Sequence, residues 1–473
     1  MIASKEFKYR QVNLTAMVLL PLWLAACTMP VVTPENDVRE VAPQRWSTNA
    51  QSVETIEPAE FWAQWNDATL LDLVERVQKS SPQVESALAN LRQARASIQS
   101  TNATLWPSAS IGVNTQSTRA KGTTENSYKA TLSGSWDINL AGASYARYDA
   151  AIYNARSKAW ALEAVKDQLI AQVATAYINL RAAQEKEALI KETLLSYEET
   201  AKLATWKAEA GLGDLADAET ARVQVKSAEV SLYQIQKSIA EYKNVIARLI
   251  AVPNDQLPIP EVGKIPTVQQ GLAVNIPAST MMQRPDIRQT IESLYSAAKG
   301  VQAAEADFFP TLSLSGSIGT QAATVSALGA SGTGVGALAA ALSMPILNWG
   351  SFNAAKESAQ ASLDLAKANY RGTLVTALEE TDNALWAVKT TETSQKTMQE
   401  AVEHAKTAWQ LAKLQYESGL GDYTQLLTTE RNYLSTQESE INNRASMSNA
   451  YATLYRVLGG AWKARELSTE ITK

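Results

Sequence analysis

Cysteine and histidine are almost absent from this sequence: its 473 residues include one of each, Cys27 and His404. Zinc sites, disulfide frameworks and cysteine–histidine nucleophiles each require several such side chains together, so classical metal or thiol catalysis is close to excluded. A Ser-His-Asp triad would have to rest on a single histidine. We therefore expect no catalytic residue, no metal site and no cofactor.

The sequence also lacks an excess of basic residues: it has 43 Lys and Arg and 48 Asp and Glu, which gives a formal net charge of −5. Nucleic acid normally requires a basic face, so it is not an expected partner. Chain breakers are also scarce: the 21 Gly and 15 Pro are clustered. This distribution predicts a few very long helices or strands.

The first 27 residues have the layout of a bacterial export signal. Three basic residues precede an apolar run over residues 12–24, which at 13 residues is too short to span a bilayer of about 30 Å as a helix. The Leu-Ala-Ala-Cys sequence that ends at Cys27 resembles a lipobox, which predicts removal of residues 1–26 and acylation of Cys27. Thr28 in place of Asp implies the outer membrane. The alternative is an ordinary signal peptide with a chance cysteine.

The rest of the chain consists of two copies of one unit of about 200 residues. "EAGLGD" at residues 209–214 recurs as "ESGLGD" at 417–422, a displacement of 208 residues, and the same displacement pairs Gly142 with Gly350. The expected division is a lipid-anchored N-terminal segment (27–66), repeat 1 (67–252), a Pro-rich linker (253–276), repeat 2 (277–460) and a C-terminal tail (461–473).

Each repeat contains a long run with almost no breakers. Residues 143–210 hold neither Gly nor Pro, and a continuous helix over these 68 residues would be about 100 Å long. Residues 351–418 contain only Gly372. Each run ends in a Gly-x-Gly-Asp turn, where Gly suits a left-handed C-cap and Asp can cap the next helix. The sequence therefore predicts two antiparallel helical hairpins, over 143–252 and 351–458.

The first long run also carries an imperfect heptad seam, interrupted by Glu187. Its members are Leu169, Val173, Ala176, Leu180, Ala183, Glu187, Ile190, Leu194, Tyr197, Ala201 and Ala204. The equivalent residues of repeat 2 are smaller and more polar. A soluble coiled coil would show the same period, so the seam alone leaves that alternative open.

Short alternating segments argue against a coiled coil alone. Apolar residues such as Ile111 and Val113 alternate with polar or small ones over residues 107–138, and the same period recurs over 310–346. Uncharged, hydroxyl-rich residues on the second face are typical of transmembrane β-barrel strands. We expect two strands in each segment, with exposed loops at 119–127 and 321–334. Aromatic residues lie at the strand–helix junctions, as in an interfacial girdle: Trp106, Phe308, Phe309 and Trp349.

Four strands cannot close a barrel on their own. An open sheet edge in hydrocarbon leaves backbone groups without partners, and the smallest spanning barrels have about eight strands. Identical subunits must therefore complete the sheet, giving eight, twelve or sixteen strands for two, three or four copies.

Together these features resemble the TolC family of outer membrane efflux channels, in its lipoprotein branch paired with resistance-nodulation-division (RND) pumps. The resemblance rests on the lipobox at Cys27, the segment that begins with "FWAQWNDATLLDLVERVQKS" at Phe61, "RPDIR" at 284–288, the prolines beside the strands, and "YESGLGDYTQLLTTERNYL" from Tyr416. It implies a mainly α fold with a membrane β-barrel: a homotrimer whose 12-stranded barrel is continued by a 12-helix periplasmic α-barrel with a mixed equatorial belt.

The resemblance also implies a role, as a passive exit duct docked by a periplasmic adaptor to an inner-membrane RND transporter. Asp217 and Tyr416 match the family's periplasmic gate, with Gln425 and Thr428 at its narrowest ring. The family often has acidic residues at that ring, so weaker cation selectivity is expected here, although Asp422 lies nearby. The two turns would be adaptor-contact tips, and a tight turn needs their glycines in any case: Gly211, Leu212, Gly213 and Asp214, then Gly419, Leu420 and Gly421.

Other functions remain to be weighed. The duct could serve type I protein secretion or heavy-metal efflux, because the pump selects the cargo, although the helices have no Met or His cluster. An envelope enzyme is a second alternative, which the internal repeat disfavours. A structural coiled-coil lipoprotein that bridges envelope layers is a third, which the alternating strands oppose.

Overall fold

The computed structural model describes residues 62, 64–268 and 278–460. The predicted signal peptide, the lipid-anchor residue Cys27 and the C-terminal tail lie outside this part of the chain. Within it, no helix is both long and apolar enough to cross a membrane.

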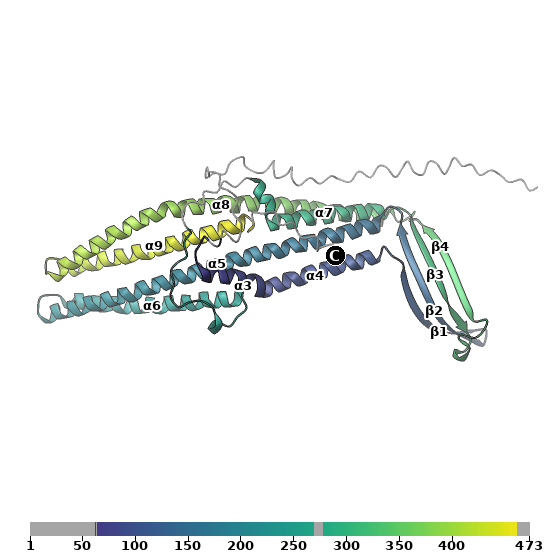
Figure 1. The fold of residues 1–473 in the computed structure, drawn as a ribbon, viewed down its shortest axis with the longest axis horizontal. Helices are drawn as coiled ribbons and strands as arrows, with labels where there is room; N and C mark the ends of the chain where they lie inside the picture. Colours follow the sequence, from purple (N-terminus) through teal and green to yellow (C-terminus); the bar gives the residue numbers. More distant parts are fainter. Residues whose placement is uncertain (1–61, 63, 269–277, 461–473) are drawn as a thin grey trace, which may run out of the picture.

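Two very long helices dominate the fold (Figure 1). They are α5 (Ala143–Glu209), of 67 residues, and α8 (Trp349–Glu417), of 69 residues. The other α-helices are α3 (Ala68–Ser80), α4 (Pro82–Ala103), α6 (Leu215–Leu249), α7 (Pro285–Ala306) and α9 (Tyr423–Val457). Short 3-10 helices are η3 (Asn254–Gln256), η4 (Ala278–Gln283) and η5 (Val325–Ala327).

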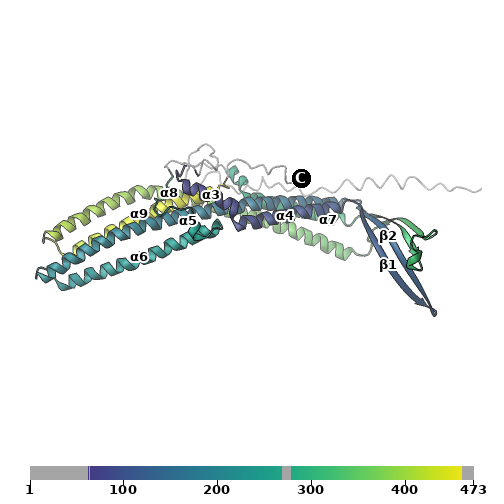
Figure 2. The ribbon, with the colours of Figure 1, turned by 60° about the horizontal axis from the view of Figure 1, so that its bottom comes forward.

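The two helical hairpins, α5–α6 and α8–α9, extend side by side and end together, while the sheet lies at the opposite end of the molecule (Figures 1 and 2). The largest hydrophobic core lies between them, near the middle of the long axis, where α3, α5 and α9 meet. Tyr177, Leu180, Tyr451 and Tyr455 are among its most buried side chains. A core in this position fixes the hairpins at one end and leaves their far ends to depend on local contacts.

The sheet contains four antiparallel strands in the order β1-β2-β3-β4. The strands are β1 (Ser108–Ala120), β2 (Thr123–Asn139), β3 (Thr311–Ala322) and β4 (Gly334–Ser343). The register aligns Ile111, Leu132 and Ile318 in one apolar row, whose side chains are 82%, 49% and 67% exposed. The adjacent row aligns Ser110, Ser133 and Ser317, so successive rows point to opposite faces. One face is thus apolar and the other carries hydroxyl groups.

The predicted fold class, mainly helical with four strands per chain, is confirmed. The prediction of an exposed loop over residues 119–127 is wrong, because strand pairing continues to Ala120 and Thr123. Only Lys121 and Gly122 form the turn, with φ of 51° and 87°. Positive φ at both central residues is the geometry of a two-residue hairpin turn, which the surrounding polar residues concealed.

The long helices follow the predicted runs closely. Helix α8 begins at Trp349, two residues earlier than expected, and Gly372 does not interrupt it. Helix α6 ends at Leu249, short of the expected residue 252, because Ala251 adopts a φ of 54°. Along the heptad seam of α5 most members are buried, but Glu187 instead pairs with Lys191 and accepts a hydrogen bond from Gln236.

The linker between the repeats crosses the middle of the helices and is fixed to them. Arg181 donates to the carbonyl of Pro260 over 3.0 Å, and the amide of Ile265 donates to Glu185 over 2.7 Å. The hydroxyl of Ser448 donates to the carbonyl of Pro266 over 2.6 Å. These bonds come from α5 and α9, so the linker braces both hairpins at the level of the main core.

Candidate functional site at the helix tips

The two hairpins turn in the same way at their far ends, which we call the first tip (residues 211–214) and the second tip (residues 419–422). Gly211 and Gly419 adopt φ of 72° and 77°. The amide of Leu212 donates to the carbonyl of Lys207, and that of Leu420 to the carbonyl of Gln415, both over 2.8 Å. This six-to-one bond after a left-handed glycine is a Schellman motif, which satisfies carbonyls at the helix end.

Each tip then starts the next helix through an aspartate. Asp214 accepts a hydrogen bond from the amide of Ala216 over 3.0 Å, and Asp422 accepts one from the amide of Gln425 over 2.7 Å. The predicted capping roles of the glycines and aspartates are confirmed. Leu212 and Leu420 point outward, 81% and 85% exposed. The tips therefore present a large apolar side chain each on a rigid turn.

A small hydrophobic cluster, which we call the tip cluster, joins the two hairpins just behind these turns. It contains residues of all four long helices: Ala201, Ala204, Ala218, Ala221, Tyr416, Tyr423, Leu426 and Leu427. Half of its members are alanines, so it buries little area per residue compared with the main core. Separation of the tips is consequently less costly than separation of the hairpins at the middle of the molecule.

Tyr416 lies at the centre of the contact between the hairpins and is 5% exposed. Its ring centre is 5.9 Å from that of Tyr423 and 3.8 Å from the Nζ atom of Lys207. Lys207 also donates a hydrogen bond to the backbone carbonyl of Tyr416. A side chain of the first hairpin thereby contacts both the ring and the backbone of a residue in the second hairpin.

Asp217, the predicted partner of Tyr416, is half-buried among other carboxylates. Its pKa is raised, first by burial and then by the charges of Asp214 and Asp422. Burial also raises the pKa of Tyr416, and the charge of Asp217 adds to this rise. The two side chains are therefore close enough to interact electrostatically. Among the described residues, however, no hydrogen bond joins the Tyr416 hydroxyl to Asp217.

The other two predicted gate residues, Gln425 and Thr428, lie on the exposed side of α9 within its first two turns. The Thr428 hydroxyl donates to the carbonyl of Thr424 within the same helix. Both side chains are exposed, and neither carries a charge.

Sequence reasoning missed two members of this region. Lys207 could have been noticed as a basic residue in the last turn of α5, where cations are favoured. Glu430 is 3% exposed and accepts a hydrogen bond from the hydroxyl of Ser196 over 2.7 Å. Burial raises its pKa, against the lowering effects of Ser196 and Lys413. No local pattern distinguishes Glu430 from the other glutamates of the same helix.

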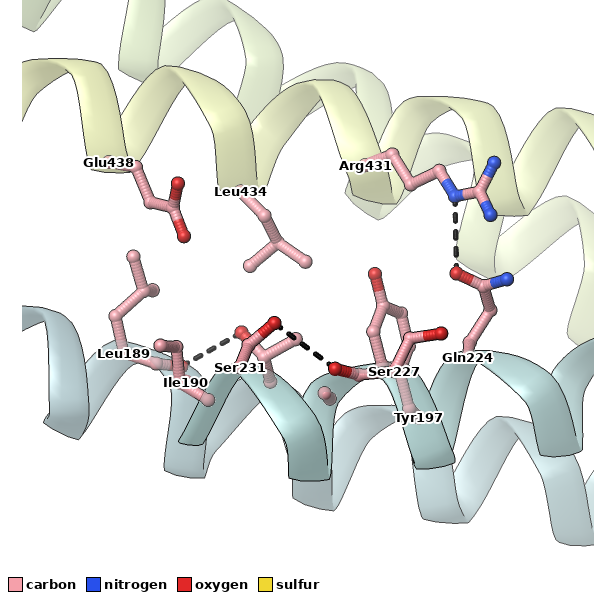
Figure 3. A pocket seen from close by; sticks show the side chains of 11 residues that line it. Leu189, Ile190, Tyr197, Gln224, Ser227, Ser231, Arg431, Leu434 and Glu438 are labelled. Carbon is pink, nitrogen blue, oxygen red and sulfur yellow. Dashed lines mark hydrogen bonds between the residues drawn. The ribbon is translucent and has the colours of Figure 1, made fainter. Parts of the chain in front are cut away.

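Grooves lie between the hairpins, farther from the turns than the tip cluster. One, of about 240 Å³, lies between α9 and the α5–α6 hairpin (Figure 3). Arg431 donates across it to Gln224 over 3.3 Å. A larger groove of about 610 Å³ lies between α5, α8 and α9, where Arg444 pairs with both Glu185 and Glu440. The Arg431–Gln224 hydrogen bond and the Arg444–Glu185 ion pair therefore join the two hairpins along these grooves.

Comparison with known proteins agrees with this architecture. The profile of the outer membrane efflux protein family matches residues 73–252 and 277–460. The toluene efflux pump outer membrane protein TtgC of Pseudomonas putida is 27% identical over 95% of this chain and 96% of its own. The outer-membrane channel OprN superposes with a TM-score of 0.81 at 25% identity, over 89% of this chain and 95% of its own.

A second solved structure, the CmeC outer membrane channel of Campylobacter jejuni, has the same fold. It superposes with a TM-score of 0.83 at 22% identity, over 88% of this chain and 90% of its own. The matched segments cover both repeats and most of the described chain. The similarity therefore extends to the whole architecture of strands and hairpins, and the chain belongs to the outer membrane efflux protein family.

Proposed function

We propose that three copies of this chain form the outer membrane exit duct of a tripartite efflux system, which conducts small toxic compounds from a periplasmic adaptor and an inner-membrane RND pump to the outside. The relative TtgC is named for toluene efflux, which supports small organic compounds as the cargo. The duct itself is passive, and the pump supplies the energy.

The observation that carries this proposal is the sheet. One face presents an exposed apolar row, suited to lipid, and the other presents serines, suited to water. Strands β1 and β4 are the first and last of the sheet, so within the described chain each has one edge without a partner strand. Because lipid cannot satisfy those edge groups, β1 of one copy must pair with β4 of the next. Three copies make a twelve-stranded barrel.

The helices would continue this barrel into the periplasm. At about 1.5 Å per residue, α5 and α8 are each about 100 Å long, far longer than a compact domain requires. Twelve helices from three copies would enclose a tube with a mixed equatorial belt. The tips would then form its periplasmic mouth, with Asp217 and Tyr416 at the gate. Gln425 and Thr428 would line an uncharged constriction, and Asp422 would supply nearby negative charge.

The tips are also the proposed contact with the adaptor. Gly211, Gly213, Gly419 and Gly421 allow tight turns, and Leu212 and Leu420 project from them as apolar anchors. Cys27 is proposed to anchor each copy to outer membrane lipid. Palmitate labelling tests this anchor: Cys27→Ala should lose the label, and retained label would refute it.

Conductance through planar lipid bilayers tests the proposed duct. The purified protein should insert and give discrete conductance steps, and opening of the tips by Tyr416→Ala should increase the conductance. Protein with β4 residues 334–343 deleted serves as the control, because its sheet cannot close. Absence of conductance from both the wild type and the Tyr416→Ala variant would contradict the proposal.

A further inference from the structure

We infer that Lys207 is the residue that keeps the two tips of each chain together, by binding the ring and backbone carbonyl of Tyr416 with its ammonium group. The inference rests on the proposed duct and names what holds its mouth closed. It assigns the closing contact to the aromatic ring of Tyr416 and not to the Tyr416 hydroxyl.

The position of Lys207 is set by the first tip. Lys207 belongs to the last turn of α5, and its carbonyl accepts the Leu212 amide of the Schellman motif. A Cβ atom at Gly213 would lie 3.1 Å from the Cβ of Lys207, so the turn packs directly against the root of this side chain. The tip therefore directs the lysine toward the other hairpin.

Two attractions act on the ammonium group at once. At 3.8 Å from the ring centre of Tyr416 it is well within the range of a cation–π interaction. The Tyr416 carbonyl that it binds belongs to the last turn of α8, where the partial negative charge of the helix end favours a cation. A lysine of one hairpin thereby stabilises the C-terminal end of the long helix in the other.

The hydroxyl of Tyr416 contributes no comparable contact. Within the described part of the chain it forms no hydrogen bond to Asp217, although the Asp217 charge raises the pKa of Tyr416. The ring is held by Lys207 and by the neighbouring Tyr423. Phenylalanine at position 416 would keep both ring contacts.

The contact is made once per chain because the repeats have diverged. The displacement of 208 residues relates Lys207 to Gln415 and Ala208 to Tyr416. Repeat 1 thus supplies the cation and repeat 2 supplies the ring, while the reverse pair, Gln415 and Ala208, has neither. This lysine–tyrosine contact between the hairpins therefore occurs at one of the two equivalent positions.

Single-channel and macroscopic conductance of purified variants in planar bilayers tests the inference. Lys207→Met keeps the side-chain length and removes the charge. Loss of a partly desolvated cation–π contact of about 1–2 kcal/mol should raise the ratio of open to closed channel roughly five- to thirty-fold. Lys207→Arg, which keeps a cation, and Tyr416→Phe, which keeps the ring, should both stay near the wild type.

Lys202→Met is the matched control, because Lys202 is an exposed lysine of the same helix with no ion pair among the described residues. It should leave the conductance unchanged. Circular dichroism and the mass of the detergent complex should be the same for all variants, which separates a gating effect from misfolding.

The possible outcomes differ in what they overturn. If the Lys207→Met channel conducts no more than the wild type while the Tyr416→Ala channel conducts more, the role of Lys207 is refuted and the proposed duct is not. An increase in Tyr416→Phe equal to that in Tyr416→Ala would assign closure to the hydroxyl and also refute it. If neither the wild type nor any variant conducts, the duct itself fails, and the inference fails with it.

Discussion

The two tips have the same backbone and different side chains. Both end a helix with a left-handed glycine and a six-to-one hydrogen bond, and both start the next helix with a capping aspartate. Yet the residue whose carbonyl accepts this six-to-one bond is Lys207 in one and Gln415 in the other. The comparison teaches that the duplicated motif specifies the turn, whereas the contact between hairpins depends on residues in which the copies differ.

A second pair of equivalent positions shows the same division. Pro82 begins α4 and Pro285 begins α7, two helices of 22 residues each. The residue before each proline is buried, but it is Ser81 in repeat 1 and Arg284 in repeat 2. Arg284 pairs with Asp286 and Glu380 and donates to the carbonyl of Val457 over 3.0 Å. In repeat 2, an ion pair therefore connects Arg284 with α8, and a hydrogen bond connects it with the end of α9.

The largest expected effect is a loss of stability when Arg284 is replaced, which tests the difference between Ser81 and Arg284. Among the described residues, Arg284→Met leaves Glu380 with Arg456 as its remaining partner. Burial opposes the lowered pKa of Glu380, and the hydrogen bond from Arg284 is the first of the causes that lower it. We expect a loss of about 3 kcal/mol in the free energy of unfolding. Thermal or denaturant unfolding in detergent measures it.

The equivalent change in repeat 1 is the control. The Ser81 side chain makes no capping hydrogen bond to α4, so Ser81→Ala should cost far less. Equal losses of unfolding free energy in the two variants would mean that the ion pairs of Arg284 contribute nothing beyond packing.

An intermediate effect sharpens the comparison of the tips. Gly211→Ala and Gly419→Ala force a Cβ atom into left-handed backbone, at a cost of about 1–2 kcal/mol each. Because the two turns share one geometry, both variants should increase amide hydrogen exchange at their own tip by a similar factor. A large difference between the two would show that the turns are not equivalent.

The smallest effect concerns pH. Because burial raises the pKa of Glu430, the folded tip favours the protonated acid, and this stabilisation is present at low pH and lost as the pH rises through the folded pKa. The protection factors of amides near Ser196 and Tyr423, which are corrected for the intrinsic pH dependence of amide exchange, should therefore be higher at pH 5 than at pH 7.5.

Glu430→Gln should remove this dependence while it keeps an oxygen to accept from Ser196. The effect should be smaller than that of the glycine changes. A pH dependence that persists unchanged in the variant would assign it to another group, of which the half-buried Asp217 is the first candidate.

Much of this architecture could be predicted from the sequence because its signals are local. Runs with no Pro and at most one Gly predicted α5 and α8 to within two residues, and alternation predicted the strands. The two-residue turn at Lys121 and Gly122 was missed, since charged and polar neighbours resemble a loop. Lys207 and Arg284 were missed as contact residues for another reason: their partners, Tyr416 and Glu380, lie on other helices, and no local pattern records that proximity.

The mass of the detergent-solubilised complex, measured by native mass spectrometry, tests the central claim most directly. If neighbouring copies complete the sheet, the complex should have the mass of three lipid-modified mature chains and should not dissociate on dilution in detergent. A stable single chain, with its strand edges unpaired, would contradict the account.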